Sequence, residues 1–285
     1  GTGMTLENSL ALKGPKKGFA PNLWDVAAFG IVLGAFALAA HGARQTLQPL
    51  EEAQQAALSL DPRMLPEYAL RTTLRMFAAM AASLAFTFTY ATLAAKSRRA
   101  EMLLIPALDV LQSVPVLGFI SFTVAGFMGL FPGRALGAEL ASVFAIFTSQ
   151  AWNMAFSFHQ SLRTVPKDLA EAARVLRLSA WQRFWRLEAP FAMPGLIWNA
   201  MMSMSGGWFF VVASEAIAVG DTTLRLPGIG SYVALAIERR DLASVGWAVL
   251  AMLVVIVICD QLIFRPLVAW GDKFRCELSA SQAAP

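Results

Sequence analysis

The feature that most constrains this chain is the stretch VGWAVLAMLVVIVICDQLIF at 245–264, in which Asp260 is the single charged residue. A helix needs about 20 mostly apolar residues to cross the hydrocarbon core of a bilayer. The whole chain is similarly apolar, because 57% of its 285 residues are hydrophobic and 15% are charged, whereas soluble domains carry about 25% charged residues. A water-soluble fold of this composition would expose too much apolar surface for a monomer. The sequence therefore predicts an all-α integral membrane protein.

Six stretches have the length and apolarity of a membrane span. They are 24–42, 69–95, 102–131, 136–158, 191–219 and 245–264. The third contains Pro106 and Pro115, which predict a kinked or broken helix. An even number of spans places both ends of the chain on one side of the membrane.

The basic residues indicate which side that is, because Lys and Arg are in excess in cytoplasmic loops. With a cytoplasmic N-terminus, fifteen of the 23 Lys and Arg fall in inside segments. The sequence thus predicts that both ends are cytoplasmic, with an N-terminal segment at 1–23 and a tail at 273–285. The first span and an external loop occupy 24–67, and the opening GTG is set aside as an expression remnant. The net charge of +4 requires no nucleic acid partner.

Nothing in the sequence indicates a catalytic or metal site. Cys259 and Cys276 have no CxxC partner, and His41 and His159 lack the spacing of metal ligands. The phosphate-loop pattern of nucleotide-binding proteins is also missing. We therefore predict no catalytic residue and no bound metal.

The segment DLAEAARVLRLSAWQRFWRLEAP, at 168–190, is unusually charged for this chain and lies in the largest inside loop. Pro166 ends the preceding helix, so a new helix is expected to begin near Lys167. A narrow apolar stripe runs along that helix at Leu169, Ala172, Ala173 and Leu176. Ser179 can cap a second short helix, which is expected to end before Pro190.

Three interpretations of this helix pair are open from the pattern alone. It can lie in the lipid headgroups with Trp anchors and Arg tails, or it can dock a soluble partner. A catalytic loop is disfavoured because the segment holds no paired carboxylates and no nucleophile with a base.

The segment resembles the EAA motif, the coupling motif of ABC importer permeases. Glu171, Ala172 and Ala173 match its opening, and Leu187 and Pro190 match its late aliphatic residue and its proline. Arg177 stands where the family usually has Gly, which calls into question the tight turn usual between the two helices.

The resemblance extends over about 68–272, which would form a core of five transmembrane helices. LRTTLRMFAA resembles the start of the shared permease core, and LDVLQSVPVLGF resembles a proline-containing stretch of the branch that imports nitrate, bicarbonate, alkanesulfonates and taurine. SEAIAVGDTTLRLPGIGSYV resembles that branch's Glu-containing span end followed by a Gly-x-Gly turn. The implied fold is the type I ABC importer permease fold with six transmembrane helices.

This resemblance implies a transport subunit of the bacterial cytoplasmic (inner) membrane rather than an enzyme. ATP and Mg would be bound by two separate cytoplasmic ATPase subunits, and the coupling helices at 167–189 would dock in a groove on each. Glu171 and Arg174 would make polar contacts at the groove rim. A second permease half, identical or homologous, and an external substrate-binding protein would complete the importer of a small solute. The alternatives are a secondary transporter or a membrane-embedded enzyme with an interfacial helix pair at 167–189.

Polar residues inside spans are costly and mark either a solute path or helix contacts. The candidates for the path are Gln112, Ser113, Gln150, Trp152, Asn153, Ser205 and Trp208. Gln150 and Asn153 are three residues apart, so we expect both to face the cavity. Ser205 and its neighbours can instead serve close helix packing, and the two tryptophans can be gates or packing. Glu215 is expected to be structural, bonded to backbone amides of the turn that contains Gly228 and Gly230.

Overall fold

The computed structural model describes residues 33–34, 37, 40–41, 44, 58–219 and 222–274. The chain divides into two units, 1–43 and 44–285, and the second contains every element discussed below. The predicted first span, 24–42, lies almost wholly outside the described residues. The same is true of the predicted N-terminal segment 1–23 and of most of the tail 273–285.

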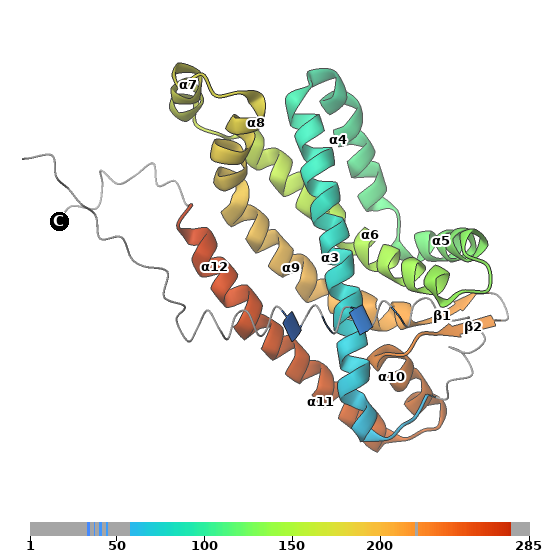
Figure 1. Ribbon diagram of the computed structural model, residues 1–285. Coiled ribbons are helices and arrows are strands. Elements are labelled where there is room, and N and C mark those ends of the chain that lie inside the picture. Colours follow the sequence, from blue (N-terminus) through green and yellow to red (C-terminus); the bar gives the residue numbers. More distant parts are fainter. Residues whose placement is uncertain are drawn as a thin grey trace, which may run out of the picture. The chain divides into compact units, whose positions relative to one another are not determined.

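The described part of the second unit is almost entirely helical (Figure 1). Its elements are η2 (Pro62–Met64), α3 (Leu65–Lys96), α4 (Arg98–Ser113), α5 (Val116–Leu130), α6 (Ala135–Arg163), α7 (Lys167–Val175), α8 (Ala180–Arg183), η3 (Phe184–Glu188), α9 (Ala189–Glu215), β1 (Ala216–Val219), β2 (Thr222–Arg225), α10 (Ile229–Glu238), α11 (Leu242–Cys259), η4 (Asp260–Phe264) and α12 (Arg265–Asp272). The elements η3 and η4 are single π-helical turns, and η2 is a 3₁₀ turn.

Three helices in the described residues are long and apolar enough to cross a membrane. They are Pro62–Lys96, Ala180–Glu215 and Leu242–Asp272. They contain the second and sixth predicted spans and most of the fifth. The fourth predicted span coincides with α6, which has sufficient length at 29 residues but is not among the three. The membrane character is thus supported, while the number of six spans stays a prediction.

The third predicted span is broken, as its prolines suggested. Val114 has the extended conformation, with φ −73° and ψ 126°, and Pro115 then caps α5. The cause is steric, because the ring of a proline disfavours the helical conformation of the residue before it. Pro106, by contrast, lies inside α4. The two pieces have 16 and 15 residues, so each is shorter than a spanning helix.

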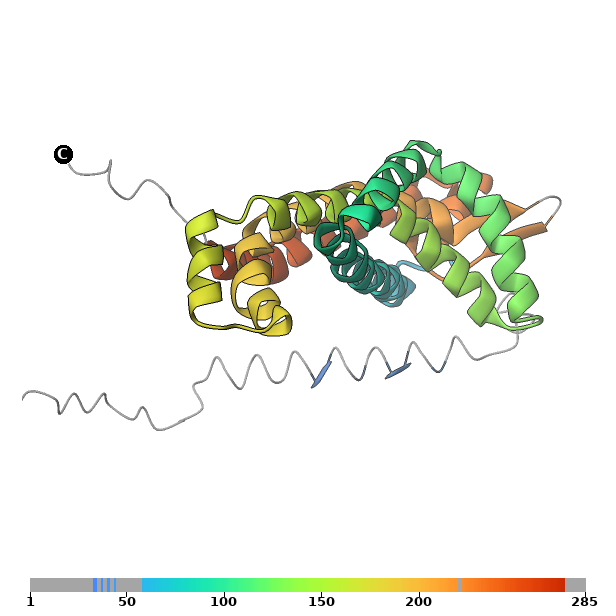
Figure 2. The same cartoon turned by 90° about the horizontal axis from the view of Figure 1, so that it is seen from above.

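The core lies where α3, α6 and α9 pack together. Its fully buried side chains include Met76 of α3, Ile146, Met154 and Phe158 of α6, and Met204 and Val211 of α9. α7 and α8 lie at one end of this body and α10 lies at the other (Figure 1). Seen from above, α7 and α8 are on the side opposite α5 and the strand pair (Figure 2).

A short antiparallel hairpin is the departure from an all-helical fold within the described residues. β1 pairs with β2 in the register Ala216↔Arg225 to Val219↔Thr222. The predicted fifth span, 191–219, was therefore too long at its end, because α9 ends at Glu215 and the strand begins at Ala216. Beyond the hairpin, the Asp241 carboxylate caps α11, and the hydroxyl and amide of Ser244 lower the pKa of that carboxyl.

Candidate coupling site

The first helix of the charged loop begins at Lys167, as the sequence predicted, and ends in a tight turn. Leu178 N donates to Ala173 O at 3.1 Å and Arg177 N donates to Arg174 O at 2.9 Å, which is the hydrogen-bond pattern of a Schellman motif. Arg177 adopts a left-handed conformation with φ 51°, the conformation that glycine favours at this position. The tight turn called into question by this arginine is therefore present, and Arg177 adopts it at some conformational cost.

Replacing Arg177 by Gly is expected to stabilise this turn by about 1 kcal/mol, because the left-handed region costs a residue with a Cβ about 1–2 kcal/mol and part of that gain is lost to unfolded-state entropy. Hydrogen exchange of the amides in 167–178 should slow in Arg177→Gly. The matched control is Arg174→Gly, which places glycine inside α7 and should speed exchange by a comparable free energy. Faster exchange in Arg177→Gly would show that the turn is not strained.

The second helix begins with the cap that the sequence predicted. The Ser179 hydroxyl accepts from Gln182 N at 3.2 Å, and the Gln182 side chain accepts from Ser179 N at 3.1 Å. This reciprocal pair is a capping box, and it fixes where α8 begins after the turn at Arg177.

The expectation that this helix ends before Pro190 was wrong. α8 passes through the π-turn η3, Phe184–Glu188, directly into α9. Proline breaks a helix when the α-helical pattern requires its missing N–H, but here Ala189 N donates to Phe184 O across the wider turn. Pro190 is the second residue of α9 and follows this turn directly, so its missing N–H falls at the junction between the π-helical and α-helical hydrogen-bond patterns. The loop is therefore continuous with α9, and the two belong to one helix that is long and apolar enough to cross a membrane.

Aromatic side chains attach α8 and η3 to the helical body. Phe184 is buried in the main core cluster, with its ring centroid 6.4 Å from that of Phe158 in α6. The Trp185 ring lies 6.3 Å from Phe88 of α3 and 5.1 Å from Phe184. A displacement of α8 must therefore displace these neighbours or break the packing.

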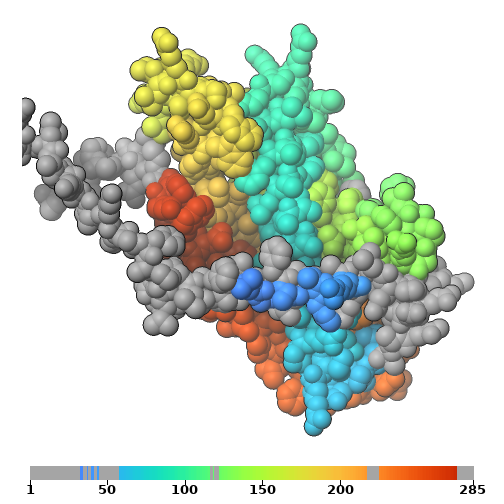
Figure 3. All heavy atoms as spheres, in the orientation of Figure 1, coloured from blue at the N-terminus to red at the C-terminus, as the bar shows by residue number. Residues whose placement is uncertain are grey.

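The outer surface of α7 and α8 combines apolar and charged side chains. Its exposed members include Glu171, Ala172, Arg174, Val175, Leu176, Arg177 and Trp181. Val175 is 81% exposed and Trp181 is 72% exposed, although large apolar side chains in soluble proteins are usually buried. Ala173 is buried inward, and Leu187 and Pro190 are half-buried. Figure 3 shows this segment, in yellow, standing out from the body, so it is available to a partner.

The expectation that Gln150 and Asn153 share a cavity-facing surface was wrong. Gln150 is fully buried, and its amide lies between Met76 Sδ of α3, at 3.1 Å, and Gly207 of α9. Asn153 is exposed. Positions three apart on a helix differ by about 60° around its axis, which is enough to move a side chain out of the groove between α3 and α9.

The other candidates for the path also differ in how far their side chains are exposed. Gln112 and Ser113 are exposed at the end of α4, where they bond to Asp109. Trp152 is half-buried in an aromatic cluster, with its ring 5.5 Å from Phe86. Ser205 is exposed on α9, whereas Trp208 is buried. Asn153, Gln112, Ser113 and Ser205 are thus the members of the set whose side chains reach an open surface.

A buried ionic network joins four helices at the end of α9. Arg75 of α3 donates to Glu139 of α6 through Nε and Nη2, at 2.7 and 2.8 Å, and to Glu215 Oε1 through Nη1, at 2.8 Å. Glu215 Oε1 also accepts from Thr72 Oγ1 at 2.7 Å, and Oε2 accepts from Gly230 N at 2.7 Å. The hydrogen bond expected between Glu215 and a backbone amide of the turn is therefore present.

Sequence reasoning did not identify Arg75, Glu139 and Thr72 as partners of Glu215. A signal was available, because a charged residue inside a predicted span needs a partner, and Arg75, Glu139 and Glu215 are charged residues of three different predicted spans. Gly228 and Gly230 belong to the same site, since a Cβ on either would overlap the Glu215 carboxylate or approach it closely.

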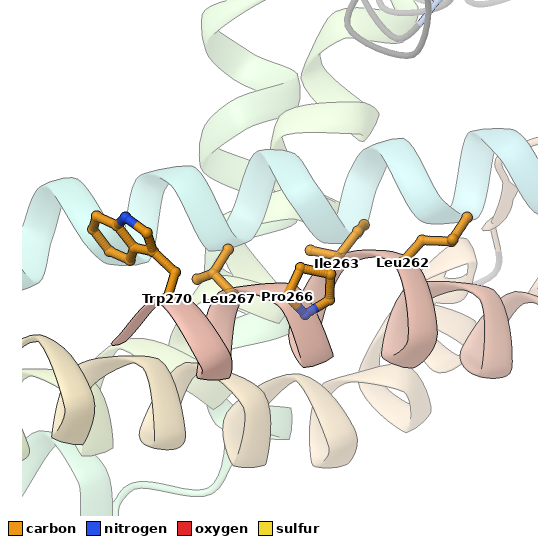
Figure 4. A pocket seen from close by; sticks show the side chains of 5 residues that line it. All are labelled: Leu262, Ile263, Pro266, Leu267 and Trp270. Carbon is orange, nitrogen blue, oxygen red and sulfur yellow. The ribbon is translucent and has the colours of Figure 1, made fainter. Parts of the chain in front are cut away.

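The surface of η4 and α12 carries an open groove, and its lining is apolar. Leu262, Ile263, Pro266, Leu267 and Trp270 line it (Figure 4). Such a lining offers no hydrogen bonds to a polar solute. In the described part of the chain, no group of three or more His, Cys, Asp or Glu side chains is placed to hold a metal ion.

The chain matches the model of a known family. The model of the family described as "Binding-protein-dependent transport system inner membrane component" matches residues 87–265, which is more than half of the chain. This range includes α6, the loop that carries α7 and α8, and α9.

Several curated permeases are similar in sequence. The bicarbonate transport system permease protein CmpB of Synechococcus elongatus is 22% identical over 178 residues, covering 62% of this chain and 58% of that protein. The glycine betaine/carnitine transport permease protein GbuB of Listeria monocytogenes is 29% identical over 173 residues, covering 59% and 54%. The nitrate import permease protein NrtB of Leptolyngbya laminosa is 26% identical over 128 residues, covering 45% and 41%. The chain thus aligns with about half the length of the curated relatives it matches.

A solved structure of the MetNI methionine ABC transporter, in an inward-facing conformation, has the same fold. The superposition has a TM-score of 0.57 at 13% identity and covers 76% of this chain and 97% of that one. At this identity the likeness concerns the fold alone. It supports the type I importer permease architecture predicted from the sequence.

Proposed function

Because this chain belongs to the family of binding-protein-dependent transport system inner membrane components, we propose that it is the permease subunit of an ATP-driven importer. In this proposal α7 and α8 dock ATPase subunits, two per transporter. ATP and Mg bind to those subunits, and the present chain supplies half of the path for the solute. A second permease half, identical or homologous, supplies the other half, and an external substrate-binding protein delivers the solute. The chain lies in the bacterial inner membrane with both ends in the cytoplasm.

One observation carries the docking role. The exposed surface of α7 and α8 bears Val175, Leu176 and Trp181 between charged side chains, and the same segment continues without interruption into the membrane-crossing helix α9. A pair of helices resting in the headgroups would not require that continuity. A lever between a soluble motor and a transport path requires it.

The proposed solute is a small compound of the nitrate, bicarbonate, sulfonate or taurine type. Two of the relatives described above are named for bicarbonate and nitrate, and a third is named for glycine betaine and carnitine. The polar groups proposed to line the path are the open ones, Gln112, Ser113, Asn153 and Ser205. They are neutral hydrogen-bonding groups, so the binding protein would supply most of the selectivity.

Reversing one charge on the docking surface tests the coupling role. In Glu171→Lys the complex is expected to hydrolyse ATP while importing several-fold less solute per ATP, because an exposed carboxylate proposed to meet the ATPase rim becomes repulsive. Arg174→Glu should act in the same way. The measurement is the ratio of solute uptake to hydrolysis in proteoliposomes containing the ATPase subunits and the binding protein.

The matched control for both variants is Glu67→Lys, which reverses an exposed charge far from α7. Glu67 pairs with Arg71 at the other end of α3, so its uptake per ATP should stay at the wild-type level. Coupling at the wild-type level in both Glu171→Lys and Arg174→Glu would contradict the role of this surface.

A further inference from the structure

Two ion pairs connect the loop that carries α7 and α8 to the turn between α3 and α4. Before the loop, Arg163 of α6 donates from Nη1 to Glu101 Oε2 of α4 at 2.5 Å. After the loop, Glu188 of η3 accepts from Lys96 Nζ of α3, at 2.6 Å to each of its carboxylate oxygens. We propose that the turn 96–101 is a clasp that receives the movement of the coupling loop and transmits it to α3 and α4. This inference rests on the proposed function.

The two pairs have opposite polarity. The turn offers a cation, Lys96, to the segment that leaves the loop, and an anion, Glu101, to the segment that enters it. An exchange of partners would bring like charges together, so the arrangement fixes which end of the loop each side of the turn holds. Both ends of the loop are thereby linked to one short segment.

Glu188 is the better buried member of the clasp. Its side chain is 11% exposed, and Arg183 Nε lies 3.2 Å from Oε1 in addition to the Lys96 ammonium. Pairs with restricted solvent access are screened less by salt than surface pairs. Glu188 also belongs to the π-turn that continues into α9, so the contact with α3 is made where the loop becomes a membrane helix. π-turns occur often at functional sites.

The segment that receives these contacts is stiff enough to transmit movement. A single residue, Ser97, joins α3 to α4 and caps α4 by accepting from Ala100 N. Farther from the turn, Tyr90 OH of α3 donates to Leu104 O of α4 at 2.6 Å. α3 then continues for 21 residues from Lys96 to Arg75, roughly 32 Å of helix. A displacement at the clasp would therefore move α3 as a rigid body and reach the buried ionic network at Arg75.

A fluorescent reporter on α3 can test the clasp in the complex with its ATPase. Bimane is attached at Leu93→Cys, an exposed position near the clasp, with Cys259 and Cys276 replaced by Ser. The complex is placed in nanodiscs, and the emission change between the nucleotide-free and the ATP–vanadate states is recorded. We expect Glu188→Gln and Lys96→Met each to reduce this change by about threefold or more, within the range seen for residues that carry coupling. The amount of bound ATPase should stay unchanged.

Three controls separate transmission from a loss of structure. Lys96→Arg keeps the charge and should retain the wild-type change, as should Glu67→Gln, whose carboxylate is remote from the clasp. Glu101→Arg combined with Arg163→Glu reverses one pair and should recover the change that either single variant loses. Thermal midpoints of the variants show whether each remains folded.

The outcomes are distinct. A wild-type emission change in Glu188→Gln and Lys96→Met would overturn the clasp, and so would a reversed Glu101–Arg163 pair that is as impaired as its single variants. Loss of bound ATPase in the clasp variants alone would overturn it too, because these residues would then belong to the docking surface. A wild-type chain that binds no ATPase would overturn the proposed function, and the clasp with it.

Discussion

Arg75→Met is expected to leave little folded protein, with a loss of about 3–5 kcal/mol in the free energy of unfolding. The arginine is 5% exposed and is the cation shared by Glu139 and Glu215, of which Glu215 is fully buried. Its removal leaves two carboxylates without a countercharge in the helical body, where a lone ion is poorly solvated. Fluorescence-detected size exclusion and thermal unfolding in detergent would measure the effect.

The matched control for this variant is Arg71→Met, one helical turn away. Arg71 makes a more exposed pair with Glu67, and pairs of that kind contribute about 0–1 kcal/mol. The double variant Arg75→Met/Glu215→Gln should be less destabilised than the sum of its single variants, since it removes a charge of each sign. Equal losses for Arg71→Met and Arg75→Met would show that the buried network does not stabilise the fold.

Gly230→Ala is expected to be the second most damaging change, with a loss of about 3 kcal/mol in the free energy of unfolding. Overpacking and the loss of a hydrogen bond both contribute to this loss. An added Cβ would overlap the carbonyl oxygen of Val212 in α9 and lie 2.9 Å from Glu215 Oε2. The clash involves backbone, which cannot rotate away. α10 would have to move away from α9. The hydrogen bond that Gly230 N donates to Glu215 Oε2, at 2.7 Å, would then lengthen or break.

Gly206→Ala provides the comparison for this steric argument. Gly206 lies inside α9 with no atom within 4 Å of an added Cβ, so alanine there should stabilise the helix by about 1 kcal/mol. Thermal midpoints of the two variants in the same detergent should therefore move in opposite directions. A neutral Gly230→Ala would mean that α10 is not held tightly against α9.

Local features of the structure were predictable where their cause lies within a few residues of sequence. The break at Pro115 follows from the restriction that a proline places on Val114, and the beginning of α8 follows from the reciprocal bonds of Ser179 and Gln182. The apolar stretches that form most of α3, α9 and α11 are equally local signals. The resemblance of Glu171–Pro190 to a coupling motif indicated the family, which the match over residues 87–265 then established.

Features that depend on the wider context were missed. Pro190 was expected to end a helix, but the π-turn before it removes the hydrogen bond that proline cannot donate. Arg177 adopts the left-handed conformation that glycine favours, because the Schellman hydrogen bonds and the helices on either side fix its backbone. Gln150 is buried because Met76 and Gly207 approach from two other helices. The pairing of Arg75 with Glu215 joins positions 140 residues apart. The charges inside the predicted spans indicated that each needs a partner, but no local pattern indicates which partner it has.

Copurification of the wild-type chain with candidate ATPase subunits distinguishes a docking surface from a helix pair that lies in the lipid headgroups. The chain and these subunits are expressed together, the permease is captured, and bound ATPase is quantified with its hydrolysis rate. We predict ATPase in stoichiometric amount, bound through the surface that contains Glu171, Val175 and Trp181. A folded permease that retains no ATPase would contradict it and would leave α7 and α8 as helices that rest in the lipid headgroups.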